Sequence, residues 1–368
     1  MKRILMICPF PFLRDRGSPL LVYNCITALS ELGHQVDLLC FPLGRDPKVK
    51  NIKVHTVLRF TKNIPIGYSW MKPIYDILLL LKALRFRIRN DFDIIHGQHF
   101  EGALIGAIVK GKLPLYYTIH SLLSEEMKIT KVFGAEIFQT VFKFFEKIVY
   151  RVSDKIFPVS PSFIDVVGQY SNKAKCNFIP DIAPGAEIKK AITKKISTMF
   201  PIKVKFMYAG NLSVYQGVDL LIKAFRGLDA YLLVVGGAGE KLNYYKQLAK
   251  KYEVNHIHFL GQQLAEDIPS YLHAADVLVS PRLEGSNIPS KLYSYIEARK
   301  PIILTEIEAH TQINKNAFLY SEPNLEDLAD KVSLMLDSNL RNRYQKKVAA
   351  IAKFFSRKAY IDLVKKTY

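Results

Sequence analysis

Residues 280–295 carry the side chains of this chain that are best suited to chemistry. The segment is expected to leave an apolar strand, cross a polar loop and enter a helix near Pro289, since proline suits a first helical turn. Free N–H groups at a helix amino terminus attract anions, and Arg282 and Lys291 flank this one, so the segment suits a diphosphate. Glu284 lies on the loop, where its carboxylate can accept hydrogen bonds from hydroxyl groups. An ordinary capped loop would show the same local pattern, and that alternative stays open.

Two other apolar segments, residues 93–96 and 115–120, end in histidine. The carboxyl ends of parallel strands face the ligand crevice, so His96 and His120 are expected where chemistry takes place. His99 and Glu101 extend the first histidine into a cluster. That cluster has no third well-spaced ligand and no HExxH pattern, so we interpret it as a wall of the crevice and expect no metal site.

The elements that hold these residues alternate between short apolar strands and amphipathic helices, which is typical of parallel α/β domains. Strands are expected at residues 3–8, 35–41, 93–96, 115–120, 206–209, 231–235, 256–260 and 277–280, with helices at 20–32 and 217–225. Residues 177–204 are rich in proline and lysine and are interpreted as an interdomain linker. The pattern therefore predicts two parallel α/β domains in tandem, with a cleft between them.

The charge of the chain is its most unusual compositional feature. Its 368 residues include 52 Lys and Arg against 33 Asp and Glu, a formal net charge of +19. Such an excess favours an anionic partner, which can be a nucleic acid, an acidic membrane surface or a phosphate-bearing small molecule. The hydrophobic fraction of 49% excludes wholesale disorder. The longest apolar run, residues 74–81, is too short to span a bilayer.

The amino terminus begins with charged and then apolar residues, as an export signal does. Pro9 and Pro11 interrupt that run and no small-residue cleavage site follows, so we expect a first strand instead. The four cysteines, at positions 8, 25, 40 and 176, have neither metal-ligand nor redox spacing. They are expected to be reduced residues of a cytosolic protein.

Two stretches in the first half of the chain are both basic and amphipathic. In residues 79–89, Lys82, Arg85 and Arg89 fall on one helical face. In residues 142–155, basic residues recur every four positions, at 143, 147, 151 and 155, beside apolar residues at 142, 145, 148, 149 and 152. Such a helix can lie at an anionic membrane surface, or it can present a solvated face over a core-packed stripe. Both interpretations stay open.

Five segments, in order along the chain, resemble the GT-B glycosyltransferases, and in particular the retaining enzymes of family 4. In the 280–305 motif an acidic loop residue leads into a helix, then Lys300-Pro301 and a strand. The others are residues 9–36, TIHS at 118–121, SDKIFPVS at 153–160, and YAGNL with QGVDLL at 208–221. The resemblance covers nearly the whole chain. It implies two Rossmann-like domains with parallel sheets facing a central cleft, one at 1–182 and rejoined by the last helix at about 352–368, the other at 183–351.

The resemblance also implies roles for individual residues. The second domain would bind a nucleotide sugar and the first an acceptor, and His120 and Glu284 would lie on opposite sides of the donor sugar as the catalytic pair. The donor-binding positions carried over are Gly17, Gly210, Asn211, Gln216, Arg282, Gly285, Ser286, Asn287, Ile288, Lys291 and Ser294. The acceptor side would include Arg14, Arg16, His96, His99 and Glu101.

Three donor positions depart from the family pattern. Family members carry an Arg and a Lys that grip the diphosphate where this chain has Asn211 and Gln216, and a Glu that holds the ribose where it has Ser294. Losing two cations from a buried phosphate site is costly. We therefore expect Arg282 and Lys291 to replace the missing cations.

The expected function is transfer of a sugar from a nucleotide diphosphate to a hydroxyl of a lipid-linked or polysaccharide acceptor, with retention, in cell-envelope glycan synthesis. The protein would be cytoplasmic and peripheral at the inner face of an anionic membrane. No metal or cofactor is expected, since the helix amino terminus and Arg282 would stabilise the leaving diphosphate. A non-catalytic GT-B-like domain that binds an anionic polymer and a nucleotide-sugar 2-epimerase stay open as alternatives. Nucleic acid is not an expected partner, because the sequence has no recognised nucleic-acid module.

Overall fold

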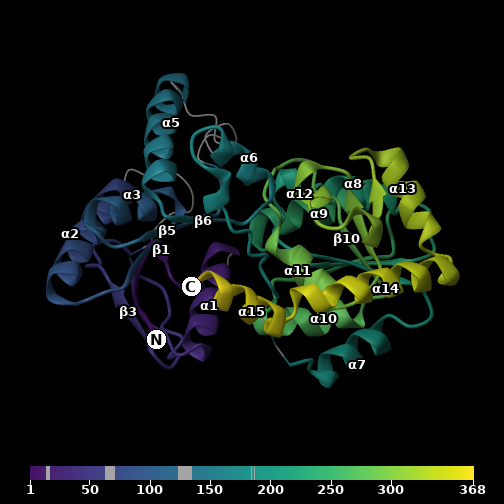
Figure 1. Ribbon diagram of the computed structural model, residues 1–368. Helices are drawn as coiled ribbons and strands as arrows, with labels where there is room; N and C mark the ends of the chain where they lie inside the picture. Colours follow the sequence, from purple (N-terminus) through teal and green to yellow (C-terminus); the bar gives the residue numbers. More distant parts are fainter. Residues whose placement is uncertain (14–16, 63–70, 123–134, 184, 186) are drawn as a thin grey trace. The chain divides into compact units, whose positions relative to one another are not determined.

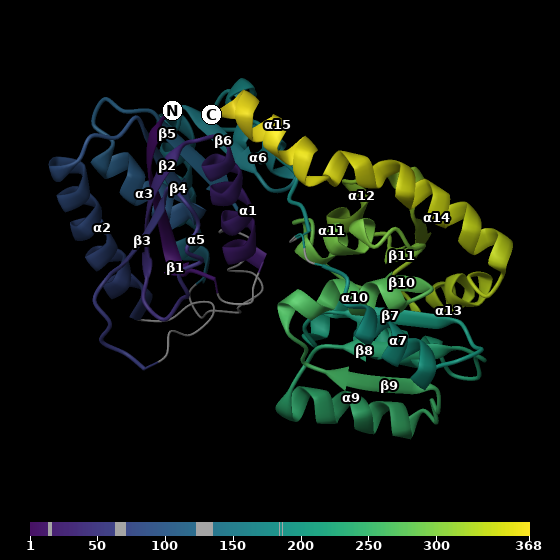
Figure 2. The ribbon, with the colours of Figure 1, turned by 90° about the horizontal axis from the view of Figure 1, so that it is seen from below.

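The chain folds into two compact units, each built on a parallel sheet (Figure 1, Figure 2). The computed structural model describes residues 1–13, 17–62, 71–122, 135–183, 185 and 187–368. The first unit comprises Met1–Asp181 and Tyr360–Tyr368, and the second comprises Ile182–Ala359.

The first unit contains six parallel strands in the order β3-β2-β1-β4-β5-β6. The strands are β1 (Arg3–Pro11), β2 (Gln35–Phe41), β3 (Ile52–Thr56), β4 (Ile94–Gln98), β5 (Leu115–Ile119) and β6 (Lys155–Pro158). The chain moves outward from β1 to β3 and then crosses back to β4. The strand order therefore reverses between β1 and β4, and ligands of open α/β sheets bind beside such a reversal, at the carboxyl ends of the strands.

Helices cover both faces of this first sheet. They are α1 (Gly17–Glu31), α2 (Met71–Arg89), α3 (His99–Val109), α5 (Ala135–Val152), α6 (Ser162–Gly168) and the end of α15 (Arg357–Thr367). One face packs Leu5 and Ile95 against α2 and α3, and Tyr117 against α3 and α5. Side chains alternate along a strand, so His96 and Thr118 point to the opposite face, where α1 and α15 lie (Figure 2).

The second unit repeats this architecture, with the strand order β12-β11-β10-β7-β8-β9. Its strands are β7 (Lys205–Ala209), β8 (Tyr231–Val235), β9 (Ile257–Gly261), β10 (Val277–Ser280), β11 (Ile302–Thr305) and β12 (Leu319–Ser321). Its helices are α7 (Lys190–Met199), α8 (Val218–Ala224), α9 (Gly239–Lys251), α10 (Ile268–Ala274), α11 (Ser290–Glu297), α12 (Glu308–Thr311), α13 (Leu325–Leu334) and α14 (Ser338–Ala352). The strand order reverses between β7 and β10, and α11 follows β10 directly in the chain.

An aspartate precedes β4, β6 and β10, and each one locks the start of a neighbouring strand. Asp93 accepts a hydrogen bond from the backbone N–H of Arg3 at 2.7 Å, and Asp276 accepts one from Lys205 at 2.8 Å. In return, the N–H groups of Asp93 and Asp276 donate to the carbonyl oxygens of Arg3 and Lys205. Asp154 forms the same reciprocal pair with the first residue of β5. These pairs satisfy terminal backbone groups and fix the strand register.

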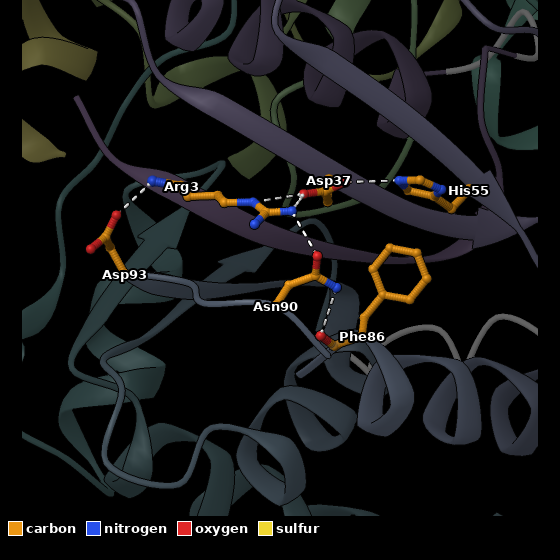
Figure 3. Close-up of polar contacts among 6 residues, drawn as sticks. All are labelled: Arg3, Asp37, His55, Phe86, Asn90 and Asp93. Atoms are coloured by element: carbon orange, nitrogen blue, oxygen red, sulfur yellow. Dashed lines mark hydrogen bonds and ion pairs between the residues drawn. The ribbon is translucent and has the colours of Figure 1, made fainter. Parts of the chain in front are cut away.

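Arg3 extends this lock across the amino end of the first sheet (Figure 3). Its guanidinium donates to Asp37 of β2 at 3.0 Å and to Asn90, beyond the end of α2, at 3.0 Å. The second carboxylate oxygen of Asp37 lies 2.8 Å from Nε2 of His55 on β3. One buried carboxylate thus joins three neighbouring strands.

The structure corrects several expected elements. The interval 177–204 is not a continuous linker, because α7 forms within it. β1 runs on to Pro11, with a register shift between Cys8 and Pro11 that accommodates the prolines. The chain returns to the first unit at Tyr360 rather than at about 352, and the ring of Phe355 packs 5.6 Å from that of Tyr293 in the second unit.

All four cysteines are free thiols, and burial raises the pKa of Cys40 to about 12.

Candidate functional site

Arg282 organises the loop that joins β10 to α11. Its guanidinium is buried, with 7% of the residue exposed. Nε donates to the carbonyl of Glu284 at 2.7 Å, Nη1 donates to the carbonyl of Asn287 at 3.1 Å, and Nη2 donates to Oδ1 of Asn287 at 3.0 Å. The Arg282 carbonyl in turn accepts a hydrogen bond from the hydroxyl of Thr305 on β11. The side chain therefore clamps its own loop.

Gly285 makes room for that clamp. Its φ of +124° lies in a region that side chains disfavour, and a Cβ there would lie 2.0 Å from Nη2 of Arg282. Gly285 also accepts a hydrogen bond from the backbone N–H of Ala309, which ties the loop to α12.

Lys291 lies in the first turn of α11 and reaches toward the end of β7. Its Nζ donates to Oε1 of Gln216 at 2.6 Å and lies 4.4 Å from the ring centroid of Tyr208. Burial, and then the nearby charge of Arg282, lower the pKa of Lys291 well below its ordinary value. Gln216 thus stands where the family carries a lysine, and it accepts a hydrogen bond from Lys291.

Tyr208 connects the same cluster to the loop after β7. Its hydroxyl donates to the carbonyl of Asn211 at 2.5 Å, and a Cβ on Gly210 would lie 2.9 Å from that hydroxyl oxygen. The structure therefore brings together five of the expected donor residues, which are Gly210, Asn211, Gln216, Arg282 and Lys291. The Asn211 residue is exposed, while Gln216 is buried.

The remaining donor positions of the second unit lie along the same loop and helix. Glu284 is exposed, so its carboxylate is available to a ligand. Ser286 and Ile288 are buried, and Asn287 is held by Arg282. Ser294 is half-buried on α11, one turn after Lys291.

Sequence reasoning missed a buried histidine beneath this loop. His310 lies within hydrogen-bond distance of Ser280 Oγ at 3.2 Å and of the Thr305 carbonyl at 2.9 Å. Burial lowers its pKa to about 3, so the ring is neutral. The polar residues that end the apolar strands β10 and β11, Ser280 and Thr305, were the available signal.

In the first unit, His99 and His120 lie at the carboxyl ends of β4 and β5. His120 follows β5, and its Nε2 lies 2.8 Å from Oε1 of Gln98. The ring of His99 stacks on that of His120, with centroids 4.3 Å apart and planes 13° apart. Burial lowers the pKa of His120 to about 3 and that of His99 well below its ordinary value. Both rings are therefore neutral at pH 7.

The other expected acceptor-side residues are placed differently. The expectation that His96 ends its strand is wrong, because β4 runs on to Gln98. His96 is 1% exposed and lies within hydrogen-bond distance of Thr118, Gln98 and Tyr368, so it supports the cluster from inside the unit. Glu101 is half-buried on α3. The burial of Asp76 raises the pKa of that residue to about 8, and the nearby charge of Glu101 contributes to the same shift. Arg14 and Arg16 lie outside the described residues. Gly17, predicted as a donor position, begins α1 of the first unit.

Within residues 1–13, 17–62, 71–122, 135–183, 185 and 187–368, no group of three or more His, Cys, Asp or Glu side chains is arranged to hold a metal ion. No helix within these same ranges is long and apolar enough to cross a bilayer.

Two sequence families match the chain. Residues 190–351 match the family described as Glycosyl transferases group 1, and residues 16–181 match Glycosyltransferase Family 4. The chain belongs to these GT-B glycosyltransferases. The resemblance inferred from its motifs is thereby confirmed.

Individual relatives agree with this assignment. A phosphatidyl-myo-inositol mannosyltransferase of Mycobacterium leprae is 24% identical over 360 residues, which are 93% of this chain and 90% of that protein. An uncharacterised glycosyltransferase of Methanocaldococcus jannaschii is 26% identical over 273 residues, 69% of each chain. The structure of Anabaena HepE in complex with UDP has a TM-score of 0.78 at 16% identity and covers 100% of this chain and 99% of its own. This likeness confirms the GT-B fold.

Replacing Gly285 with alanine is expected to break the Arg282 clamp, because the new Cβ would displace the guanidinium and with it the bonds of Nη1 and Nη2 to Asn287. The loss of two hydrogen bonds, about 2 kcal/mol, should lower the midpoint of thermal unfolding by about 4 °C or more. The matched control is Gly227→Ala. Gly227 also has a positive φ, +75°, but nothing lies within 4 Å of its Cβ. Equal midpoints for the two variants in differential scanning fluorimetry would contradict the clamp.

Proposed function

We propose that this glycosyltransferase moves a sugar from a nucleotide diphosphate to a hydroxyl of a lipid-linked or polysaccharide acceptor, with retention, in cell-envelope glycan synthesis. The observation that carries the donor half is the cluster of Lys291, Gln216 and Arg282 at the start of α11. The solved relative HepE supports a nucleotide-sugar donor, since its structures contain UDP and UDP-glucose. The mannosyltransferase of Mycobacterium leprae, named for a phosphatidylinositol substrate, supports a lipid-linked acceptor.

Of the two residues expected to replace the missing cations, Lys291 would act on the diphosphate directly and Arg282 would act through its loop. The Arg282 guanidinium donates its hydrogen bonds to Glu284 and Asn287 of the loop, and so would orient the backbone N–H groups that precede α11. Lys291 is held by Gln216 and is destabilised as a cation while no anion is near. A bound diphosphate would supply that anion, so binding would favour the charged form of Lys291. The helix amino terminus adds to the same field.

The reaction would proceed without a protein nucleophile. The bond between the anomeric carbon and the leaving phosphate oxygen breaks, the acceptor oxygen bonds to that carbon, and the acceptor proton passes to a phosphate oxygen. Lys291 and the helix amino terminus would stabilise the charge that grows on the diphosphate, in place of a metal ion. His120 would contact the donor sugar as a neutral ring, and Glu284 would accept hydrogen bonds from its hydroxyls.

A screen of nucleotide sugars tests the donor half of this proposal. We expect one nucleotide sugar to raise the thermal midpoint and to be hydrolysed slowly without acceptor, with activity that a chelator leaves intact. Glu284→Ala should lower that turnover about tenfold or more, since it removes hydrogen bonds to the sugar. Glu326→Ala, which removes an exposed carboxylate on α13, is the control. No response to any donor would instead favour a non-catalytic domain, and the exposed Asn211 in place of a cation favours that second candidate.

The affinity for a nucleoside diphosphate should depend on pH through Lys291. Its pKa is depressed in the free protein and should rise when the diphosphate binds, so binding takes up a proton. Affinity is therefore highest below the free pKa and falls as pH rises toward the bound pKa, by up to about tenfold per pH unit. Calorimetry with UDP from about pH 7 to about pH 9 measures this slope. Lys291→Met should bind weakly without the slope, and Lys346→Met on α14 should keep it; a slope that survives in Lys291→Met would refute this role.

The exposed face of α2 supports peripheral binding to a membrane. Four apolar residues lie on one side of the helix and are 40–83% exposed: Ile74, Ile77, Leu81 and Ile88. The opposite side is buried in the core. Arg85 and Arg89 are exposed along the edge of this α2 stripe. The apolar stripe can insert among lipid acyl chains, and the cations at its border can bind anionic headgroups.

A second helix on the same face of the sheet offers a similar feature. α5, which packs with α3, exposes Phe144 to 60%, beside Lys143. Not every expected cation takes part. Lys82 donates to the Thr56 carbonyl, and Lys155 lies on β6 rather than on the helix and donates to the Thr367 carbonyl. The basic repeat of 142–155 therefore ends with α5 at Val152.

Binding to vesicles tests this surface. We expect the protein to sediment with vesicles that contain phosphatidylglycerol, and to be released from them by salt, while neutral phosphatidylcholine vesicles retain much less. The double variant Ile77→Ser, Leu81→Ser should lose at least about tenfold in affinity, because it returns two apolar side chains to water. Ile202→Ser, at an exposed position of the second unit, should bind as the wild type does. Unchanged binding of the double variant would exclude the α2 stripe as the contact.

A further inference from the structure

A chain of hydrogen bonds connects Tyr368 to His120 through the interior of the first unit. The hydroxyl of Tyr368 lies 2.5 Å from Nδ1 of His96. Nε2 of His96 lies 3.1 Å from the amide nitrogen of Gln98, whose Oε1 lies 2.8 Å from Nε2 of His120. Thr118 Oγ1 also lies 2.8 Å from Nε2 of His96. The function proposed above uses only the last ring of this chain.

The part of this hydrogen-bond chain from His96 to His120 is buried, and neither of its imidazole rings is charged. His96 and Gln98 are each 1% exposed, and His120 is 5% exposed. Burial lowers the pKa values of His96 and His120 to about 3. Each imidazole therefore carries one proton at neutral pH, on either Nδ1 or Nε2, and its partners decide which.

The Gln98 amide makes the two choices interdependent. With Oε1 toward His120, it accepts the Nε2 proton of that ring, and its NH₂ group donates to Nε2 of His96. His96 must then carry its proton on Nδ1 and donate it to the oxygen of Tyr368. If Tyr368 donated instead, His96 would be protonated on Nε2, the amide would turn over, and His120 would hold its proton on Nδ1.

This choice determines what a ligand meets at His120. Within the part of the chain that the structure describes, no hydrogen bond occupies its Nδ1. The stacked ring of His99 and the edge-on ring of Phe10, 6.3 Å away, hold the imidazole in place. Nδ1 offers a lone pair in the first arrangement and an N–H donor in the second.

We propose that Gln98 is a positioning residue that holds His120 protonated on Nε2, so that Nδ1 accepts a hydrogen bond from a substrate hydroxyl, and that Tyr368 sets this arrangement from the far end of the chain. The role toward substrate rests on the glycosyl transfer proposed above. The coupling between the rings does not, because it concerns protons inside the unit.

Tyr368→Phe tests the coupling without touching His120. Without the tyrosine oxygen, the Nδ1 proton of His96 has no acceptor, so the ring should protonate Nε2, Gln98 should turn over, and His120 should move its proton to Nδ1. Long-range ¹H–¹⁵N spectra of ¹⁵N-labelled full-length protein report which ring nitrogen is protonated, with the His120 signals assigned by His120→Asn.

Tyr116→Phe is the matched control. The centroid of the Tyr116 ring lies 5.3 Å from that of Tyr368 and 6.3 Å from that of His96. Among the described residues, no hydrogen bond joins the Tyr116 hydroxyl to Tyr368, His96, Gln98 or His120. This variant should leave the His120 tautomer unchanged. A His120 spectrum that is the same in Tyr368→Phe and wild type, or that shifts equally in Tyr116→Phe, would overturn the coupling.

The substrate role is tested by kinetics with the donor identified in the screen. Gln98→Leu should lower kcat about tenfold, the effect of one lost hydrogen bond, and leave the Kd for UDP within about twofold. Gln98→Glu keeps an acceptor for the Nε2 proton of His120 and should restore most of kcat. Normal kcat in Gln98→Leu would refute the positioning role. If the tautomers respond as expected but no donor is turned over, the coupling holds and the proposed transfer fails.

Discussion

Polar side chains buried at the carboxyl ends of parallel strands need hydrogen-bond partners, and both units depend on how this need is met. An unsatisfied buried donor or acceptor costs about 1–3 kcal/mol, so few arrangements of such residues are tolerated. In the second unit the Arg282 guanidinium meets the need by holding the loop before α11. In the first unit His96, Gln98 and His120 meet it by bonding to one another and to Tyr368. Each network ends at a candidate functional residue of its own unit, Lys291 in the second and His120 in the first.

The same constraint changes the meaning of the net charge. Several cations that the sequence offers to a partner are used inside the fold: Arg282 on its loop, Lys82 and Lys155 on backbone carbonyls, and Arg3 on Asp37. Lys291 is held by Gln216 with a lowered pKa. Exposed cations also lie beside exposed apolar side chains on α2 and α5. Part of the excess of +19 is therefore used to hold the fold, and further cations lie at the start of α11, on α2 and α5, and elsewhere on the surface.

Much of the fold could be predicted because apolar runs bounded by turn residues identify buried strands. β2, β8 and β10 begin and end at the predicted residues. β3 was missed because it is a partly exposed edge strand with the mixed sequence IKVHT. α7 was missed because prolines and lysines surround an amphipathic helix that buries only Ile196. The positions of His120 and Lys291 followed from the motifs, whereas the roles of Gln98, Tyr208 and His310 did not.

The sequence by itself determined the family, the two parallel α/β domains, and which residues stand at strand ends and at the start of α11. Periodicity and motif spacing are local properties, so they specify the face and the end of an element on which a residue lies. Only the tertiary structure decided which distant groups meet. Lys291 reaches Gln216 across 75 positions, and Tyr368 reaches His96 across 272. Those pairings depend on how helices pack onto sheets. They hold Lys291 beside Gln216, and they connect Tyr368, which follows α15, to His96 and through Gln98 to His120.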